Sequence, residues 1–301
     1  MSLIILDGGM GRELHRRGAP FRQPEWSALA LTESPHIVTE AHLDFIHAGA
    51  EVITTNAYAV VPFHIGKVRF QNEGENLAQT AAQLARDAVV QSGKNVQIAG
   101  SLPPLFGSYR PDLFDVNHAA EIALPLINGQ KNIVDIWLAE TQSSIAEALF
   151  VRHLLCDDER EFWVSFTLED THPHTEPMLR SGETVADAVA ALMSENVAAV
   201  LFNCSQPEVM ADAVGVAKKV MDTHSGSLKM KIGVYANAFE PQTEQMNDAN
   251  DGLDAIRPDI TPEHYLQWAK IWCDLGANIV GGCCGITPEH IAQLQIALKY
   301  D

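Results

Sequence analysis

Short apolar runs alternate along the chain with longer stretches whose apolar positions are three and four residues apart. The short runs have the length and β-branched composition of buried strands, and the longer stretches have the spacing of one helix face. The predicted strands are Leu3–Leu6, Glu51–Thr55, Val96–Ser101, Asp135–Glu140, Phe162–Thr167, Ala198–Asn203, Lys231–Tyr235 and Asn278–Gly281. The predicted helices are Pro35–His47, Asn76–Gln91, Ser143–Leu155, Thr184–Ser194, Pro207–Met221, Pro262–Leu275 and Pro288–Leu298. The pattern therefore predicts a repeating strand–helix unit.

Three of the predicted helices begin with the same signature. A hydroxyl residue precedes a proline at Ser34-Pro35, Thr261-Pro262 and Thr287-Pro288. A serine or threonine side chain caps the free N–H groups of a helix start, and proline fits the first helical position because an N–H there would have no partner. We expect helices to begin at these prolines, each capped by the preceding hydroxyl.

The number of units and the length of the chain favour one fold. Eight units in 301 residues match a single (β/α)8 barrel, the TIM barrel, and a doubly wound parallel sheet is the alternative. Without a Pro/Gly/Ser-rich linker or a low-complexity tract, residues 1–301 are expected to form one domain. Active sites of such barrels lie at the carboxyl ends of the strands. The distinctive residues predicted there are Asp7, Glu140, Cys204, Cys283 and Cys284.

Acidic residues outnumber basic ones, 39 to 20, and give a net charge of −19. Nucleic acids and anionic membrane surfaces bind basic patches, so we expect neither as a partner. The chain has no run of about 18 apolar residues, the length that a membrane span requires. Its start, MSLIILDGG, lacks the basic segment of a signal peptide. We expect a cytoplasmic protein whose negative charge serves solubility, with binding of a cationic small molecule as the alternative.

The stretch GGCCG, residues 281–285, places two cysteines side by side at the end of the last predicted strand. Neighbouring side chains on an extended strand point to opposite faces, so Cys283 and Cys284 can share a ligand only if the chain turns there. The flanking residues Gly282 and Gly285 permit such a turn. Cys204 follows the sixth predicted strand and brings a third thiol to the same end of the barrel.

Three converging thiols indicate a metal site. Three thiolates leave one position of a tetrahedral zinc open for a substrate, whereas a structural zinc is closed by four protein ligands. The paired C-x2-C spacing of a zinc ribbon is absent. A vicinal disulfide or redox pair, and two small buried residues, are the alternatives for the adjacent cysteines. The other cysteines, Cys156 and Cys273, lie within or at the end of predicted helices, where we expect small buried side chains.

A set of motifs runs through nearly the whole chain: LDGGMGREL (6–14), EVITTNAY (51–58), AGSLPP (99–104), WLAET (137–141), VSFTLED (164–170), LFNCS (201–205), VYANA (234–238) and GGCCGITPEHI (281–291). In this order they resemble the homocysteine S-methyltransferase family, and GGCCG together with NCS is the most specific part. The resemblance implies a (β/α)8 barrel that holds Zn2+ by Cys204, Cys283 and Cys284.

The resemblance also implies a homocysteine site. Its substrate-binding residues would be Asp7, Gly8, Gly9, Tyr58, Glu140 and Asn237. The two acids would bind the amino group of homocysteine, and the two glycines would bring the backbone close to it. Tyr58 and Asn237 would line the pocket.

The implied reaction is the transfer of a methyl group to the thiol of homocysteine, which gives methionine. Zinc would deprotonate the acceptor sulfur, which would attack a methyl carbon bonded to an onium centre. The catalytic residues would be Cys204, Cys283, Cys284 and Glu140. S-methylmethionine is the favoured donor and betaine the second. The alternatives are the homocysteine-binding module of a cobalamin-type methionine synthase system and a vicinal-dithiol redox or interaction protein.

The chain departs from the family pattern in three places where a methyl donor would bind. ETQSS stands where the family often has ETIP, PPLFGSYRPDLF (103–114) replaces a glycine-rich stretch, and ANAFEP is followed by a long acidic segment. We interpret this segment, 239–260, as a solvated loop, with a lid over the site as the alternative. HPH at 172–174 is interpreted as loop histidines rather than a metal pair.

Overall fold

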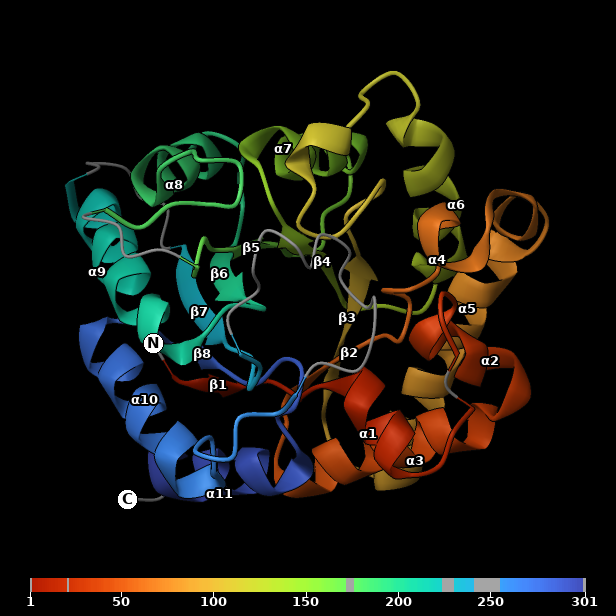
Figure 1. Cartoon of the computed structure of the whole chain (residues 1–301), viewed down its shortest axis with the longest axis horizontal. Coiled ribbons are helices and arrows are strands. Elements are labelled where there is room, and N and C mark those ends of the chain that lie inside the picture. Colours follow the sequence, from red (N-terminus) through yellow and green to blue (C-terminus); the bar gives the residue numbers. More distant parts are fainter. Residues whose placement is uncertain (1, 21, 172–175, 224–229, 241–254, 300–301) are drawn as a thin grey trace.

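The computed structural model describes residues 2–20, 22–171, 176–223, 230–240 and 255–299. Within these residues, eight parallel strands form one sheet that curls into a ring (Figure 1). Neighbours in the sheet follow the order β1-β8-β7-β6-β5-β4-β3-β2. The strands are β1 (Ile4–Ile5), β2 (Val52–Thr54), β3 (Gln97–Leu102), β4 (Ile136–Gln142), β5 (Phe162–Thr167), β6 (Ala199–Asn203), β7 (Lys231–Tyr235) and β8 (Ile279–Val280). Each lies where the apolar pattern predicts a strand.

The ring closes between β1 and β2. Leu6 forms a parallel bridge with Val52, whose carbonyl accepts a hydrogen bond from the Asp7 N–H at 3.1 Å. The Glu51 N–H donates to the Ile5 carbonyl at 2.8 Å. A doubly wound sheet keeps two free edges, so this closure excludes that alternative and confirms the (β/α)8 barrel.

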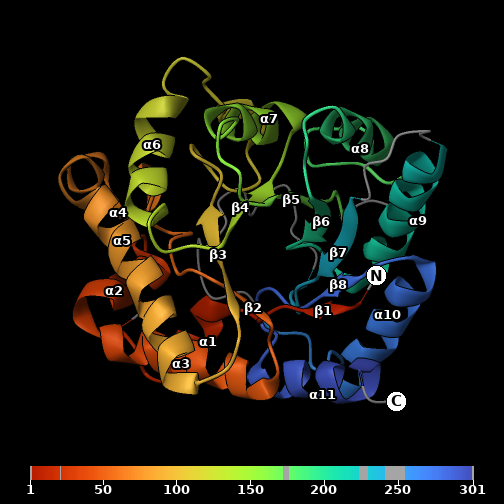
Figure 2. The ribbon, with the colours of Figure 1, turned by 180° about the vertical axis from the view of Figure 1, so that it is seen from behind.

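Helices surround the ring on its outer side (Figures 1 and 2). In the described part of the chain they are α1 (Met10–Arg16), α2 (Ala30–Glu33), α3 (Pro35–Ala48), α4 (Pro62–Ile65), α5 (Lys67–Ser92), α6 (Ala119–Gln130), α7 (Ile145–Leu154), α8 (Val185–Met193), α9 (Pro207–Thr223), α10 (Pro262–Leu275), α11 (Pro288–Lys299) and the 3-10 helices η1 (Trp26–Leu29) and η2 (Pro111–Leu113). Among these helices we find none with the length and apolar character needed to cross a bilayer.

The structure adds helices that the pattern did not predict. Helix α6 carries Pro125 and Gly129, which weaken its helical signal. Gly129 is required by packing, because a Cβ there would lie 2.3 Å from the Glu75 carbonyl oxygen of α5. Helix α5 is also longer than predicted, since it begins at Lys67 rather than Asn76.

The three proline starts are confirmed, but their caps differ. Thr261 caps α10 by accepting a hydrogen bond from the His264 N–H at 3.3 Å. Ser34 precedes α3 without a side-chain capping bond, so that part of the prediction is wrong. The reason is that α2 ends directly before it, and the Ser34 N–H still bonds to the Ala30 carbonyl at 3.0 Å. The Thr287 hydroxyl lies 3.0 Å from the His290 ring instead.

Side chains fill the interior of the ring. They come from all eight strands or the residues flanking them, and comprise Leu6, Val52, Ala99, Ile136, Leu138, Trp163, Ala199, Leu201, Tyr235 and Ile279. A larger cluster fills the layer between strands and helices. Because the interior is packed, a ligand can bind only beyond the ends of the strands.

Candidate active site

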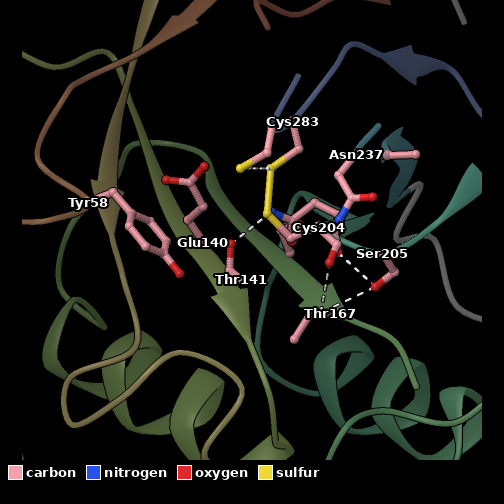
Figure 3. The surroundings of a disulfide bond; sticks show 12 residues. Tyr58, Glu140, Thr141, Thr167, Cys204, Ser205, Asn237 and Cys283 are labelled. Atoms are coloured by element: carbon pink, nitrogen blue, oxygen red, sulfur yellow. Dashed lines mark hydrogen bonds between the residues drawn. A yellow bond between two sulfur atoms is a disulfide. The ribbon is translucent and has the colours of Figure 1, made fainter. Parts of the chain in front are cut away.

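Three cysteine sulfurs meet at the carboxyl ends of the strands (Figure 3). Cys204 follows β6 directly, and Cys283 and Cys284 lie in the turn after β8. The three sulfur atoms lie within 4.8 Å of one another. The sequence predicted this juxtaposition from two distant strands, and the structure contains it.

A side chain of β4 and a backbone group just after β5 fix the turn that carries Cys204. The residue before it, Asn203, donates from Nδ2 to the Thr141 hydroxyl at 2.8 Å. The Ser205 hydroxyl after it accepts from the Leu168 N–H at 2.8 Å. Cys204 itself has a φ of +48°, a left-handed conformation that a non-glycine residue adopts only when its surroundings enforce it. The NCS motif therefore encodes a turn that aims the thiol inward.

The second thiol turn is held between β7 and β1. The Cys283 N–H donates to the Ala236 carbonyl at 2.9 Å, and the Cys284 carbonyl accepts from the Ala238 N–H at 2.8 Å. Gly285 has a φ of +82° and provides the predicted turn. Gly9 gives this turn room, because a Cβ there would lie 2.5 Å from the Cys283 carbonyl oxygen.

Two of the three sulfurs are bonded in this structure. Cys204 and Cys283 form a disulfide with a Cα–Cα distance of 5.7 Å, and the Cys284 sulfur lies 4.0 Å from that of Cys283. The vicinal disulfide between Cys283 and Cys284, one of the alternatives from the sequence, is therefore not formed. The bonded pair joins β6 to β8 because the strand ends bring Cys204 closest to Cys283.

The donor set fits a thiophilic metal once the disulfide is reduced. Three thiolates at these separations could bind one tetrahedral ion and leave a fourth position open. Elsewhere in the described ranges, no group of three His, Cys, Asp or Glu side chains meets the same distance criterion. Cys273 is half-buried on α10, whereas Cys156 is exposed, so the expectation that Cys156 is buried is wrong. It follows the last turn of α7, on the outer surface.

Two acids line the pocket beside the sulfurs, as the sequence predicted. Asp7 follows β1 and accepts a hydrogen bond from the Thr54 N–H at 2.7 Å. Glu140 belongs to β4 and accepts one from the Ser101 hydroxyl at 2.6 Å. Burial raises the pKa of Asp7 to about 8, with a further rise from Glu140, and raises the pKa of Glu140 to about 7. Neither acid forms an ion pair with a basic side chain of the described residues, so both are available to a cationic ligand.

Strained backbone is concentrated around the same pocket. Of the non-glycine residues with positive φ in the described ranges, all but Asn196 line it: Trp26, Tyr109, Thr141 and Cys204. The strain at Thr141 has a visible cause, because the pairing of β4 with β5 shifts register between Ala139 and Gln142. A bulge of this kind next to a site redirects a side chain, here that of Glu140.

Aromatic side chains form much of the remaining wall. Tyr58 lines the pocket as predicted, and its hydroxyl bonds to the Ser108 hydroxyl at 2.7 Å. Trp26 packs edge-on against Tyr58 with ring centres 6.3 Å apart. Asn237 does not belong to the lining, so this expectation is corrected. Its carboxamide oxygen accepts a hydrogen bond from the Phe239 N–H, and the residue lies beside the Cys204 turn (Figure 3).

Comparison with known proteins assigns the chain to a family. The model of the homocysteine S-methyltransferase family matches residues 4–298. The chain belongs to this family. It is therefore a methyltransferase, and Asp7, Gly8, Gly9 and the cysteines occupy the ends of the barrel strands that the matched region contains.

Several members of the family are similar over almost their whole length. The selenocysteine methyltransferase of Astragalus bisulcatus is 27% identical, covering 95% of this chain and 90% of its own. Homocysteine S-methyltransferase 1 of Zea mays is 27% identical, covering 98% and 94%. The metallated form of the homocysteine methyltransferase MmuM from Escherichia coli has a TM-score of 0.78 and 25% identity, covering 98% of this chain and 96% of that one.

The sequence did not single out every residue at this family site. Trp26, Tyr109, Thr141 and Tyr235 line the pocket but were not predicted to do so. Tyr109 lies in the segment 103–114, which differs from the family pattern, and that difference was the available signal. Trp26 and Thr141 depend on loop geometry and a bulge, for which the residues themselves give no signal.

Two segments from the sequence analysis fall wholly or mostly outside the described residues. They are HPH at 172–174 and the acidic segment 239–260, of which only 239–240 and 255–260 are described. Arg257, at the end of the acidic segment, pairs with Glu208 at 2.7 Å and with Asp259 at 2.7 Å.

Proposed function

We propose that this methyltransferase transfers a methyl group from an onium donor to the thiol of homocysteine and produces methionine. The observation that carries the proposal is the convergence of Cys204, Cys283 and Cys284 within 4.8 Å, between strands that are far apart in sequence. Family membership supports homocysteine as the acceptor. S-methylmethionine is the favoured donor, and glycine betaine is the second.

Zinc is the proposed metal because three thiolates with one open position match its catalytic coordination. When bound, it would lower the pKa of the acceptor thiol, so that a thiolate is present at neutral pH. The protein's own contribution is a fixed geometry. The Asn203–Thr141 hydrogen bond and the packing of Gly9 against Cys283 hold the two cysteine turns at one distance before substrate enters.

Asp7 and Glu140 are proposed to bind the ammonium group of homocysteine. Without a cation, burial raises both pKa values, and the charge of Glu140 raises that of Asp7 further, so the free pocket favours protons on the acids near neutral pH. An ammonium group supplies the missing positive charge. Its binding would therefore release protons from Asp7 and Glu140 and anchor the acceptor with its sulfur toward the cysteines.

The transfer step balances as a direct displacement. The acceptor thiol loses its proton to water, and its sulfur forms a bond to the donor methyl carbon. The bond from that carbon to the onium sulfur or nitrogen breaks, and the electron pair leaves with it. S-methylmethionine then becomes methionine, and glycine betaine becomes dimethylglycine. No group on the protein is methylated, so alignment and exclusion of water are the enzyme's tasks.

The aromatic wall supports an onium donor. Trp26, Tyr58 and Tyr109 line the pocket, and aromatic faces attract desolvated onium cations. A selenol is a second candidate acceptor, because two of the similar family members are named selenocysteine methyltransferases. Selenocysteine therefore belongs in the acceptor panel.

The test combines metal analysis with substrate panels on reduced, zinc-loaded protein. We expect about one zinc per chain and methionine formation from homocysteine with S-methylmethionine, without cobalamin. Turnover only with a cobalamin protein or methylcobalamin would favour the methionine synthase module instead. A metal-free protein that cycles between dithiol and disulfide would contradict the proposal and favour a redox role.

A further inference from the structure

No basic side chain of the described residues lines the pocket, although its proposed donors are carboxylates as well as cations. Asp7, Glu140 and the cysteines line it, but no Lys or Arg of the described residues does. S-methylmethionine and glycine betaine each carry a carboxylate near the onium centre. A buried carboxylate needs hydrogen-bond donors or a positive charge. A hydrogen-bond donor in the lining, or a positive charge directly behind it, should therefore receive this carboxylate.

Tyr109 has an available hydrogen-bond donor in this wall. It lines the pocket at a φ of +63°, in the segment between β3 and α6. Its hydroxyl makes no hydrogen bond to any described residue. Burial raises the pKa of Tyr109 well above its ordinary value, so the hydroxyl keeps its proton at neutral pH and can donate a hydrogen bond.

Arg180 supplies a positive charge behind the Tyr109 ring. The guanidinium carbon lies 4.8 Å from the ring centre, and only 8% of the Arg180 side chain is exposed. Its Nη2 donates to Asp170 at 2.7 Å and its Nε to the Thr167 hydroxyl at 3.4 Å. Nη1 has no hydrogen-bond partner in the described part of the chain.

The Arg180–Asp170 pair also fixes the wall to the cysteine turn. Asp170 accepts a hydrogen bond from the Gln206 N–H at 3.1 Å, two residues after Cys204. A buried ion pair is costly to desolvate and is weak evidence of a role in stability alone. This one connects Tyr109 and Cys204, two pocket residues with strained backbone.

The location of Tyr109 suits the donor rather than the acceptor. Asp7 follows β1, whereas Arg180 comes from the connection after β5, which lies across the ring from β1 (Figure 1). Homocysteine whose ammonium group is held by Asp7 and Glu140 would leave the wall that carries Tyr109 to the donor. The nearby Arg110 is engaged by Asp112 through two hydrogen bonds of 2.8 and 2.7 Å.

We infer that Tyr109, backed by Arg180, receives the carboxylate of the methyl donor and makes the enzyme prefer carboxylate-bearing onium compounds. Arg180 and Asp170 act as positioning residues for the ring. The kinetic test of this inference rests on the proposed function, because it measures methyl transfer. It adds a specificity residue at a segment, 103–114, where this chain differs from the family pattern.

Paired donors with and without a carboxylate test the inference. One pair is S-methylmethionine and (3-aminopropyl)dimethylsulfonium, and the other is glycine betaine and tetramethylammonium. In Tyr109→Phe we expect the kcat/KM preference for the carboxylate member to fall about 10- to 100-fold, the size of one hydrogen bond to a charged group. The loss should appear in the KM of the donor. The pair that shows the larger wild-type preference identifies the donor class.

A second variant and a matched control separate specificity from folding. Arg180→Gln keeps a planar hydrogen-bonding group for Asp170 but removes the charge, and should lower the same preference. Arg160 provides the control, because it pairs with Asp158 and stacks on Trp137 at 4.9 Å, near the opposite end of the strands. Arg160→Gln should leave the donor preference at its wild-type value.

Two results would overturn the inference. One is a wild-type enzyme with equal kcat/KM for both members of each pair. The other is a Tyr109→Phe variant in which kcat/KM falls by the same factor for both members. Titration calorimetry with S-methylmethionine separates this outcome from failure of the proposed function. If the wild type binds S-methylmethionine without turnover and Tyr109→Phe binds it more weakly, the function is wrong and the carboxylate site stands. Unchanged binding of S-methylmethionine by Tyr109→Phe would show that Tyr109 does not bind the donor carboxylate.

Discussion

At the end of the barrel where the strands begin, acidic side chains lie beside basic ones and accept hydrogen bonds from strand N–H groups. Glu51 accepts from the Ile5 N–H at 3.0 Å and pairs with Lys299. Asp135 accepts from the Ile98 N–H at 2.8 Å and pairs with Arg86 at 2.9 Å. Each of these acids has a cation within contact, so burying it adds little unfavourable charge.

At the end where the strands finish, the acids have no such partners. Asp7 is buried and Glu140 half-buried; both have raised pKa values, and neither is paired with a base of the described residues. Strained backbone gathers here as well, at Tyr109, Thr141 and Cys204.

The difference between the two ends indicates that the end with the site is less stable when no ligand is bound. Uncompensated acids, converging thiols and left-handed backbone each disfavour the empty folded protein. A metal and a cationic substrate would relieve the first two. The end where the strands begin, which carries the ion pairs of Glu51 and Asp135, is called the paired end. It has no comparable feature, and in barrels of this kind it contributes stability rather than chemistry. Substitutions at the two ends should therefore change the free energy of unfolding in opposite directions, or change stability at one end and activity at the other.

The largest expected effect is the loss of zinc and activity in Cys284→Ala. Two thiolates would remain, which is too few to hold the metal against a chelator. Metal analysis should give no bound zinc, and turnover should fall below detection, while circular dichroism shows the barrel still folded. Cys156→Ala is the control, because Cys156 is exposed after α7 and far from the cluster in sequence. Zinc retention with full activity in Cys284→Ala would remove this cysteine from the ligand set.

The second expected effect is that Asp7→Asn stabilises the metal-free protein. Its folded pKa, about 8, lies above the unfolded value of 3.8, so wild-type stability is lost as the pH rises between these values. Asparagine keeps an acceptor for the Thr54 N–H without the charge. Denaturant unfolding at pH 8 should show a gain on the order of 3 kcal/mol that vanishes below pH 4.

The opposite sign is expected at the paired end. Arg160 holds the pKa of Asp158 below its ordinary value, so this acid contributes stability above pH 4 and loses it as the pH falls. Asp158→Asn should lower stability at pH 8 by about 1 kcal/mol, because the pair is partly exposed. If both variants changed stability in the same direction with pH, the contrast between the two ends would fail.

Much of this contrast follows from the sequence. Each strand is a short and largely apolar run, so pattern alone located it. Once the strand ends were known, barrel closure brought Cys204 to Cys283 and Cys284, although residue spacing gave no hint of which pair would bond.

The parts that the sequence did not predict depend on local backbone geometry. Tyr109 and Thr141 enter the pocket through positive φ values that neither residue type favours. Asn237 was misplaced because a polar residue after a strand can face the pocket or turn back, and here the Phe239 N–H holds it. Helix α6 was not predicted because Gly129, which the packing of α6 against α5 requires, lowers the helix propensity of this stretch.

The third expected effect concerns acceptor binding. Glu140→Gln keeps an acceptor for the Ser101 hydroxyl but removes the charge proposed to bind the ammonium group. The KM of homocysteine should rise about 10- to 100-fold, as for the loss of one charged hydrogen bond. Glu161→Gln at the paired end is the control and should leave that KM unchanged. A rise in the donor KM alone would place the ammonium elsewhere.

The smallest expected effect tests whether an exposed ion pair at the paired end can be removed with little loss of stability. Lys231 pairs with Glu161 at 2.8 Å, and both side chains are partly exposed. In Lys231→Met, Glu161 keeps a hydrogen bond from the Trp163 indole N–H at 2.8 Å, and the methionine can still cover the Trp163 ring. Stability should fall by about 0.5 kcal/mol, less at high salt, without kinetic change. A loss above about 2 kcal/mol, outside the usual range for exposed pairs, or an altered KM would mean that charge at this end also supports the site.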